Sequence, residues 1–214
     1  MTTPAAPALD KACAALSIAD PALARAYTEH GRPIWRAQKP NYAMLGRMIA
    51  HQQISTKAAQ AIWARVLIQF GDDISATDVL AASDETLRGC GLSRPKVAHM
   101  RAIAAAIVSG QLSLHRVCAA PMDDARKELL AVKGIGPWTA ELVLLYATGA
   151  MDAFPVGDLG LMEAHCQLGN YSPRMDIKAF TAQAEAWRPY RGVATHLLWG
   201  WLNDQRDAAD RTRQ

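Results

Sequence analysis

The sequence predicts an all-α protein, and three observations support this prediction. Long segments repeat apolar residues at the spacing of one helix face, and Gly, Pro, Ser or Asp marks their ends. No segment keeps the alternation of apolar and polar residues that is typical of a strand. The stretch Gly134-Ile-Gly-Pro-Trp-Thr-Ala140 reads as a tight turn followed at once by an apolar helical run.

The expected helices cover most of the chain. They span residues 41–53, 55–70, 93–109, 122–132, 137–148, 176–187 and 192–204, and another helix follows Asp158. The helix at 122 follows a proline and has acidic residues in its first turn, which suits the helix dipole. Residues 1–7 and 204–214 are polar or proline-rich, so we expect frayed ends there.

Composition sets broad limits on the class of protein. The chain has 214 residues, 50% of them apolar, which is enough for one compact unit or two closely packed lobes. A formal charge of +3 is compatible with a polyanionic ligand without demanding one. The four cysteines (Cys13, Cys90, Cys118 and Cys166) are scattered, and no signal peptide or membrane-length apolar stretch is present. We therefore expect reduced thiols in a cytosolic protein, and the scattered histidines predict no transition-metal site.

The Gly134-Ile-Gly-Pro137 turn has the properties of a phosphate-binding hairpin. Its two glycines can adopt positive φ angles and allow close backbone approach, and Pro137 suits the first position of a helix. Amide N–H groups at the start of that helix would then be available to an anion. The alternative is a glycine-rich turn that only joins two core helices.

A carboxylate follows at a fixed distance beyond the hairpin, and the combination points to chemistry on DNA. The loop Phe154-Pro-Val-Gly-Asp158 contains residues that fix backbone geometry, and a helix follows it. The alternative is that Asp158 serves only as the helix N-cap. Asp152 is a weaker candidate, for which a cap or turn role fits better.

The segment Leu129-Leu-Ala-Val-Lys-Gly-Ile-Gly-Pro-Trp-Thr-Ala140, taken with Asp158, resembles the helix-hairpin-helix DNA glycosylase superfamily. Within it the chain is most similar to the 3-methyladenine DNA glycosylase II family, which excises alkylated purines. Residues 49–59, 91–97 and 187–199 fit in the same order, so the likeness covers about 41–202. The resemblance implies two helical lobes, 41–150 and 1–40 with 151–214, with the active cleft between them. Larger relatives begin with a β-rich domain, which we do not expect here because only about forty residues precede the first matching helix.

The resemblance also implies the reaction. Cleavage of an N-glycosidic bond places positive charge on the deoxyribose, which an ionised Asp158 near C1′ would stabilise while orienting or deprotonating water. Relatives that also cut the backbone use a lysine just after the hairpin, where this chain has Trp138. We therefore expect monofunctional hydrolysis.

Aromatic residues are expected to form the base pocket. N-alkylated purines are cations, and an indole face attracts a cation. By resemblance, Trp138 and Trp199 are the expected pocket walls, with Phe154 or Tyr42 as further wall residues. Core packing is the alternative for the aromatics outside the hairpin.

The DNA contacts are expected along the turn and the hairpin. Gln53 sits where relatives insert a residue into the gap left by an extruded base, although it could instead be an ordinary helix C-terminal residue. Lys133, Gly134, Ile135, Gly136 and Thr139 are the expected contacts to the DNA. Relatives also bind Na⁺ or K⁺ through backbone carbonyls at positions matching Leu130, Val132 and Ile135. No other cofactor is expected, and the lack of a cysteine after Cys166 argues against an iron–sulfur cluster.

The expected partner is double-stranded DNA, and no membrane association is expected. We expect the protein to act as a monomer in the cytoplasm, at the nucleoid if the source is bacterial. Two alternatives remain open. One is a non-catalytic module that holds DNA backbones for another protein. The other is a glycosylase for mismatched or oxidised bases, which would use the same hairpin and Asp158 with a different pocket.

Overall fold

The structure is a computed structural model that describes residues 3–212, and within that range the chain forms helices joined by turns and loops, with no strand. The chain divides into two compact units. Gln38–Thr148 form the first, here called the inserted unit, while Met1–Ala37 and Gly149–Gln214 together form the second, here called the terminal unit. The expected lobes differ from these units by only a few residues at each boundary.

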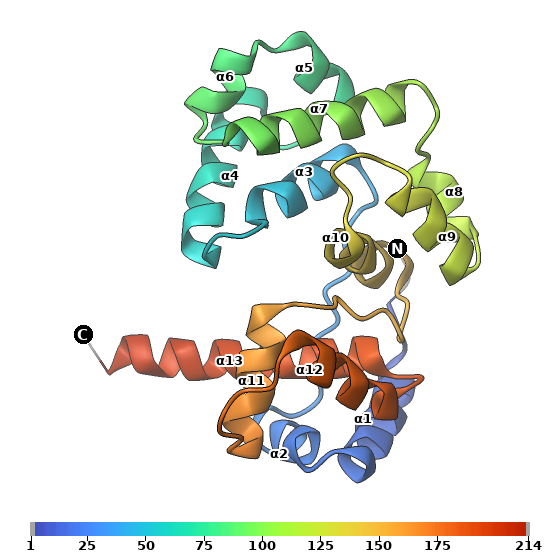
Figure 1. Cartoon of the computed structure of the whole chain (residues 1–214), viewed down its shortest axis with the longest axis vertical. Helices are drawn as coiled ribbons and strands as arrows, with labels where there is room; N and C mark the ends of the chain where they lie inside the picture. Colours follow the sequence, from blue (N-terminus) through green and yellow to red (C-terminus); the bar gives the residue numbers. More distant parts are fainter. Residues whose placement is uncertain (1–2, 213–214) are drawn as a thin grey trace. The chain divides into compact units, whose positions relative to one another are not determined.

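The inserted unit is organised around α7 (Arg94–Val108). This helix packs against α3 (Tyr42–His51), α5 (Ala76–Ala81) and α6 (Asp84–Gly89), as Figure 1 shows. The unit also contains α4 (Thr56–Phe70), α8 (Leu114–Ala119), α9 (Met122–Leu130), α10 (Pro137–Val143) and a π-helical turn at Leu144–Thr148. Short polar side chains begin most of these helices by accepting a first-turn N–H, namely those of Asn41, Ser55, Ser75, Ser83 and Ser113.

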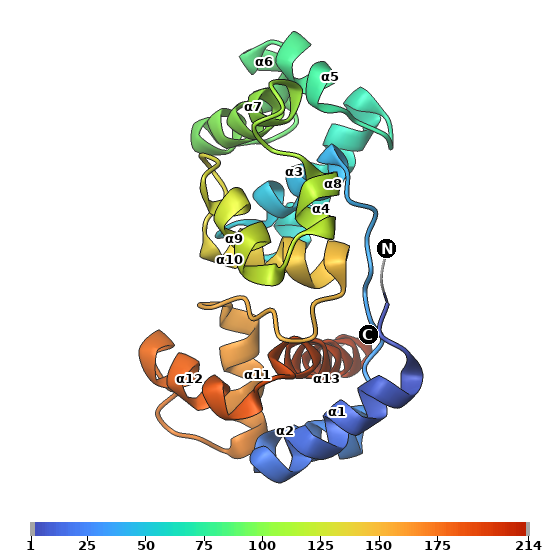
Figure 2. The ribbon, with the colours of Figure 1, turned by 90° about the vertical axis from the view of Figure 1, so that its right-hand side faces the viewer.

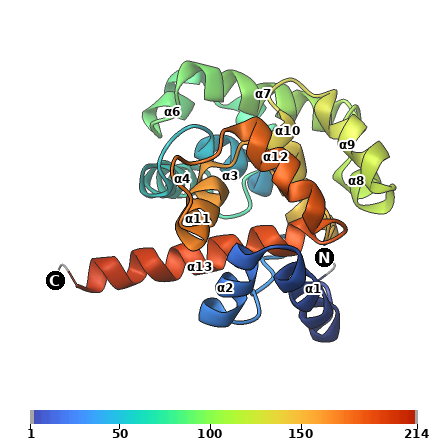
Figure 3. The same cartoon turned by 60° about the horizontal axis from the view of Figure 1, so that its bottom comes forward.

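The terminal unit is organised around the long helix α13 (Arg191–Arg211). This helix packs against α1 (Ala6–Ala19), α2 (Pro21–His30) and α11 (Leu159–Gly169), as can be followed in Figures 2 and 3. The remaining elements are α12 (Ile177–Ala184) and a 3-10 turn at Glu185–Trp187. The N-terminal helices thus complete a core whose other helices lie more than a hundred residues later in the sequence.

A buried carboxylate joins the two separate segments of the terminal unit. Asp20 is fully buried, and its Oδ1 accepts the Ala22 N–H at 2.9 Å, which caps α2. Its Oδ2 accepts hydrogen bonds from His165 (3.0 Å), Gln183 (3.1 Å) and the Trp187 indole (3.0 Å). Burial alone would raise the pKa of this carboxyl, but these hydrogen bonds outweigh it and lower the pKa to about 2. The native core therefore contains a charged Asp20.

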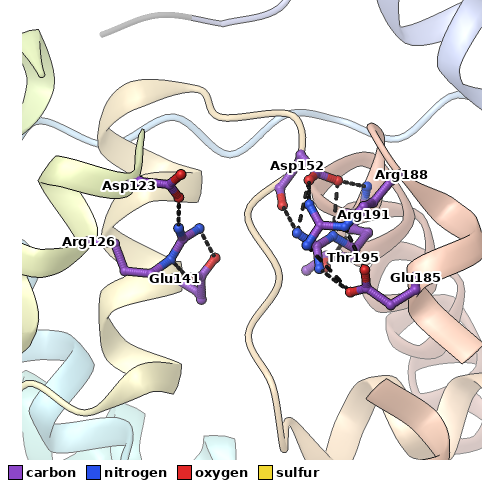
Figure 4. A network of polar contacts seen from close by, with 8 residues as sticks. All are labelled: Asp123, Arg126, Glu141, Asp152, Glu185, Arg188, Arg191 and Thr195. Atoms are coloured by element: carbon purple, nitrogen blue, oxygen red, sulfur yellow. Dashed lines mark hydrogen bonds and ion pairs between the residues drawn. The ribbon is translucent and has the colours of Figure 1, made fainter. Parts of the chain in front are cut away.

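Two further networks, one in each unit, are drawn in Figure 4. In the terminal unit, Asp152 accepts hydrogen bonds from Arg188 at 2.6 Å and from Arg191 at 3.0 and 2.9 Å. Glu185 contacts the same two arginines. Asp152 is therefore engaged in an ion-pair network that holds the loop before Asp158 to the start of α13.

In the inserted unit, Arg126 of α9 pairs with Glu141 of α10 at 2.5 Å between Nε and Oε1, and also with Asp123. The Glu141 side chain is only 10% exposed. The hydrogen bond to Glu141 raises the pKa of the Arg126 guanidinium further above its ordinary value. This pair ties together the two helices that flank the Gly134–Pro137 hairpin.

Several helix ends differ from the sequence prediction. The segment expected as helix 137–148 changes to π-helical hydrogen bonding at Leu144, and the helix expected to end at residue 53 ends at His51. Both expected frayed ends are partly helical, because α1 begins at Ala6 and α13 continues to Arg211. The short helices α5, α6 and α8 had no predicted counterpart because six residues are too few to show a clear period.

None of the helices in the described range combines the length and the apolar character needed to cross a lipid bilayer.

Candidate active site

Asp158 lies at the junction between a tight loop and α11. Gly157 takes a φ of +80°, and the Asp158 N–H donates to the Pro155 carbonyl at 3.1 Å. Asp158 Oδ1 accepts hydrogen bonds from the Leu161 N–H (3.0 Å) and from the Trp199 indole N–H (3.2 Å). Asp158 is thus the N-cap of α11 and also contacts α13. The cap role considered from the sequence is real, and it leaves a half-buried carboxyl beside an indole ring.

Gly160 completes the surroundings of this carboxyl, and sequence reasoning missed it. A Cβ atom at this position would lie 3.2 Å from Asp158 Oδ1 and 3.8 Å from Trp199 Nε1. The first of these distances is too short for an ordinary van der Waals contact. The absent side chain therefore leaves room for the hydrogen bond between Asp158 and Trp199.

Trp199 belongs to a row of aromatic rings in the terminal unit. Its ring and that of His196 are T-shaped with centroids 6.1 Å apart, and His196 in turn stacks on Trp35 with ring centroids 4.1 Å apart. His196 Nδ1 donates to the Gly192 carbonyl, and Nε2 accepts the Arg36 N–H, which fixes the neutral form of the ring. Burial lowers the pKa of His196 to about 4. Sequence reasoning indicated only Trp199, because Trp35 is far from the other two rings in the chain.

Two of the predicted pocket residues lie in the cores of their units. Phe154 is 2% exposed and packs against Phe180 and Trp187. Tyr42 is 5% exposed, and its hydroxyl donates to the Met100 carbonyl at 2.9 Å. The prediction that they line a pocket is corrected, because neither ring has the free surface that contact with a base requires. For both residues the core-packing alternative holds.

The hairpin rests directly on α7. Gly134 has a φ of +97°, and a Cβ atom there would lie 2.7 Å from His99 Cβ, so both conformation and space require glycine. Gly136 differs from the expectation, because its φ is −89° and a Cβ atom would meet no other atom. Gly136 is the N-cap of α10 and provides no side-chain cap, and Pro137 begins the helix.

The turn after α3 is held against this hairpin. Gln52 Nε2 donates to Thr139 Oγ1 at 3.0 Å and to the Gly134 carbonyl at 3.4 Å. Thr139 is 1% exposed, so its hydroxyl is buried where it accepts the Gln52 hydrogen bond and is not accessible to a ligand. Gln53 is exposed and adopts a left-handed backbone with φ of +57°. The sequence indicated Gln53 but gave no signal for Gln52.

The remaining predicted residues also belong to the inserted unit, at and around the hairpin. Lys133 is exposed beside the hairpin, and Trp138 is half-buried in the first turn of α10. The Val132 carbonyl accepts the Ile135 N–H at 3.0 Å, whereas no hydrogen bond between described residues ends on the carbonyls of Leu130 and Ile135. Within residues 3–212 no group of three or more His, Cys, Asp and Glu side chains is placed to hold a metal ion.

The predicted residues therefore fall into two groups. Asp158 and Trp199 contact each other in the terminal unit. Trp138, Gln53 and the hairpin belong to the inserted unit, in which α3, α7 and α10 meet.

Comparison with known proteins agrees with these motifs. Residues 47–189 match the model of the HhH-GPD superfamily of base excision DNA repair proteins. A probable bifunctional transcriptional activator and DNA repair enzyme from Mycobacterium tuberculosis is 36% identical over 165 residues, which are 73% of this chain and 32% of that protein. A putative DNA-3-methyladenine glycosylase from Bacillus subtilis is 30% identical over 168 residues, 74% of this chain and 58% of that protein.

Solved structures match as well, and one of them is a complex with DNA. The 3-methyladenine DNA glycosylase of Schizosaccharomyces pombe, in complex with abasic DNA, aligns with a TM-score of 0.80 and 27% identity, covering 88% of this chain and 95% of that chain. By contrast, the chain spans from about a third to somewhat more than half of the two curated relatives above.

Proposed function

Because the chain belongs to the HhH-GPD superfamily of base excision DNA repair proteins, we propose that it is a DNA glycosylase that hydrolyses the N-glycosidic bond of alkylated purines such as 3-methyladenine. The observation that carries the proposal is the hydrogen bond from the Trp199 indole to Asp158. It places a carboxylate directly beside an aromatic ring. The names of relatives that are 3-methyladenine glycosylases support the choice of substrate.

In the proposed reaction, Asp158 faces the sugar of the extruded nucleotide. As the bond between C1′ and the purine nitrogen breaks, positive charge develops on the deoxyribose, and a fixed carboxylate stabilises it. Water then adds to C1′, and the base leaves with the electron pair of the broken bond. The two hydrogen bonds to Oδ1 support this role, because they hold the carboxyl in one orientation before substrate arrives.

Alkylated bases would be selected by their charge. A methylated purine carries a positive charge that an indole face attracts, by roughly 1–2 kcal/mol when water is excluded. Trp199 fits this role because it is only partly buried beside Asp158, and Trp138 fits it because it occupies the first turn after the hairpin. The neutral form of His196 adds no repulsive charge behind Trp199.

We propose that the reaction stops at base release. A β-lyase would need an amine in the position that Trp138 fills, and Lys133 lies on the other side of Gly134 and Gly136. The product would be an intact strand with an abasic site.

The hairpin and the turn would bind double-stranded DNA, with the protein acting as a cytoplasmic monomer. Lys133 and the backbone of Gly134, Ile135 and Gly136 are the proposed phosphate contacts. Gln53 would fill the gap in the duplex, and its exposure supports that role. The carbonyls of Leu130, Val132 and Ile135 fit a monovalent cation, because at least two of them accept no hydrogen bond from the described residues.

The proposal is tested with Asp158→Asn on methylated duplex DNA. Asparagine is a good N-cap and keeps an oxygen for both donors to Oδ1, so only the charge is lost. We expect base release, followed by chromatography of free purines, to fall roughly 100-fold or more. Binding to undamaged duplex should stay within about threefold, since a change of 0.7 kcal/mol or less is expected away from the phosphate contacts.

The matched control is Asp207→Asn on the exposed end of α13, which should release purines at the wild-type rate. Wild-type release by Asp158→Asn would contradict the catalytic role and leave Asp158 as a cap. A wild-type protein that binds DNA but releases no base would favour a non-catalytic binding module. Release of only oxidised or mismatched bases would favour another lesion, and a cut strand would contradict monofunctional hydrolysis.

A further inference from the structure

The turn between α3 and α4 has a conformation that its sequence does not favour. Gln52 ends α3 with its N–H bonded to the Ile49 carbonyl at 3.2 Å. Gln53 then enters the left-handed region at φ of +57°, which residues other than glycine, asparagine and aspartate rarely adopt. Because the Gln53 side chain is exposed, the conformation must be maintained by its neighbours.

Two side chains supply this restraint, one from the turn itself and one from α7. Gln52 reaches across to α10 and the hairpin, where Nε2 donates to Thr139 Oγ1 and to the Gly134 carbonyl. Lys96, near the start of α7, donates from Nζ to the Ala50 carbonyl at 2.8 Å. That carbonyl belongs to the last turn of α3, where carbonyls lack helical partners and a cation is favourable.

The same three elements also meet at Gly134. The ring and backbone of His99 in α7 leave no room for a side chain on this glycine, so the hairpin backbone lies against α7. The Lys96 ammonium is half-buried, and burial lowers its pKa. The turn, the hairpin and α7 are therefore fixed to one another by two hydrogen-bonding side chains and one close packing contact.

We propose that Gln52 and Lys96 are positioning residues, which set the Gln53 turn relative to the hairpin. When a DNA strand is bound at the hairpin, the Gln53 side chain then lies next to the extruded nucleotide. This inference rests on the proposed function, since it assigns to Gln52 and Lys96 the geometry of the DNA contact. Neither residue contacts the reacting atoms.

The test compares two duplexes, one carrying a tetrahydrofuran abasic-site analogue and one undamaged. We expect Gln52→Ala and Lys96→Met each to weaken binding to the abasic duplex by about tenfold, as loss of an orienting hydrogen bond would. Binding to the undamaged duplex should change by less than about threefold, because phosphate contacts carry it. Matched controls are Gln69→Ala on the exposed face of α4 and Lys11→Met on α1, which should match the wild type on both duplexes.

A double-mutant cycle isolates the contact. Thr139→Val keeps the shape of Thr139 but removes the oxygen that Gln52 uses, so it should reproduce the loss caused by Gln52→Ala. The double variant should then lose no more than either single variant. Thr139→Ser, which keeps the hydroxyl, should retain wild-type binding.

Amide hydrogen exchange in the free protein gives a readout that needs no substrate. Exchange at residues 52–55 should be faster in Gln52→Ala and in Thr139→Val than in the wild type, whereas exchange across α7 should be unchanged. If the wild type releases no base from methylated DNA, the proposed function fails, while the two duplexes and the exchange rates still decide this inference. Unchanged abasic-site affinity, equal losses on both duplexes, or fully additive losses in the cycle would each overturn it.

Discussion

Gln53 has a strained left-handed backbone conformation although its side chain is exposed. Replacement by glycine removes the unfavourable contact of Cβ with the backbone, which costs about 1 kcal/mol in the left-handed region. We therefore expect Gln53→Gly to be more stable than the wild type by up to about 1 kcal/mol in urea unfolding. The same variant should bind the abasic duplex more weakly, because the side chain that fills the gap is absent.

Gln53→Asn separates the two effects. Asparagine tolerates the left-handed region and keeps an amide, so it should gain part of the stability and lose less affinity. A Gln53→Gly variant that is less stable than the wild type would show that Gln53 makes a stabilising contact despite its exposure. Unchanged abasic-site affinity would instead exclude Gln53 from the gap.

Single residues also show how far the sequence was informative. The resemblance to the glycosylase family makes Asp158, Trp199 and Gln53 candidates, because it rests on short motifs that can be recognised in the sequence alone. Phe154 and Tyr42 were assigned wrongly, since an aromatic in an apolar segment has the same local sequence whether it lines a pocket or a core. The roles of Gln52 and Gly160 depend on partners that only the folded chain brings close.

At the scale of elements, the all-α class followed from periodicity, but the transition from α10 to the π-helical turn did not. The segment 137–148 has one continuous apolar pattern, and nothing in it marks Leu144 as the point of change. The Thr148 hydroxyl donates to the Leu144 carbonyl, so part of the altered hydrogen bonding at this helix end is local. The six-residue helices escaped prediction because their caps, not their periods, define them.

The ion pair between α9 and α10 gives a prediction at the same scale. Arg126→Met removes the ion pair from the largely buried Glu141 carboxylate, which should cost about 2–3 kcal/mol of unfolding free energy. Arg126→Met with Glu141→Leu should regain more than half of that loss, because no charge then remains buried. Lys127→Met, which breaks an exposed pair with Asp124, should cost no more than about 0.5 kcal/mol.

Urea unfolding of the three variants measures these differences. A double variant less stable than Arg126→Met alone would mean that Glu141 stabilises the hairpin through contacts other than Arg126. In that case the packing of α9 against α10 would depend on the Glu141 carboxylate itself.

At the scale of the whole molecule, the terminal unit is assembled from two stretches separated by residues 38–148. The local sequence around Asp20 does not indicate that it accepts hydrogen bonds from three side chains of residues 149–214. The network also supports the candidate site, because His165 lies on α11, the helix that Asp158 caps. Loss of the Asp20 contacts should therefore loosen both the core and the element that positions Asp158.

Acid unfolding provides the corresponding prediction. The pKa of Asp20 is about 2 in the folded protein against an ordinary 3.8, so its stabilising effect is complete above 3.8 and is lost as pH falls toward 2. The difference corresponds to about 2 kcal/mol, and the unfolding free energy of the wild type should fall by that amount across this window. Asp20→Asn has no charge to titrate, so its unfolding free energy should be lower at pH 5 and depend less on pH between 4 and 2. Parallel pH profiles for the two proteins, measured by urea unfolding, would show that Asp20 does not enter the native core as a carboxylate.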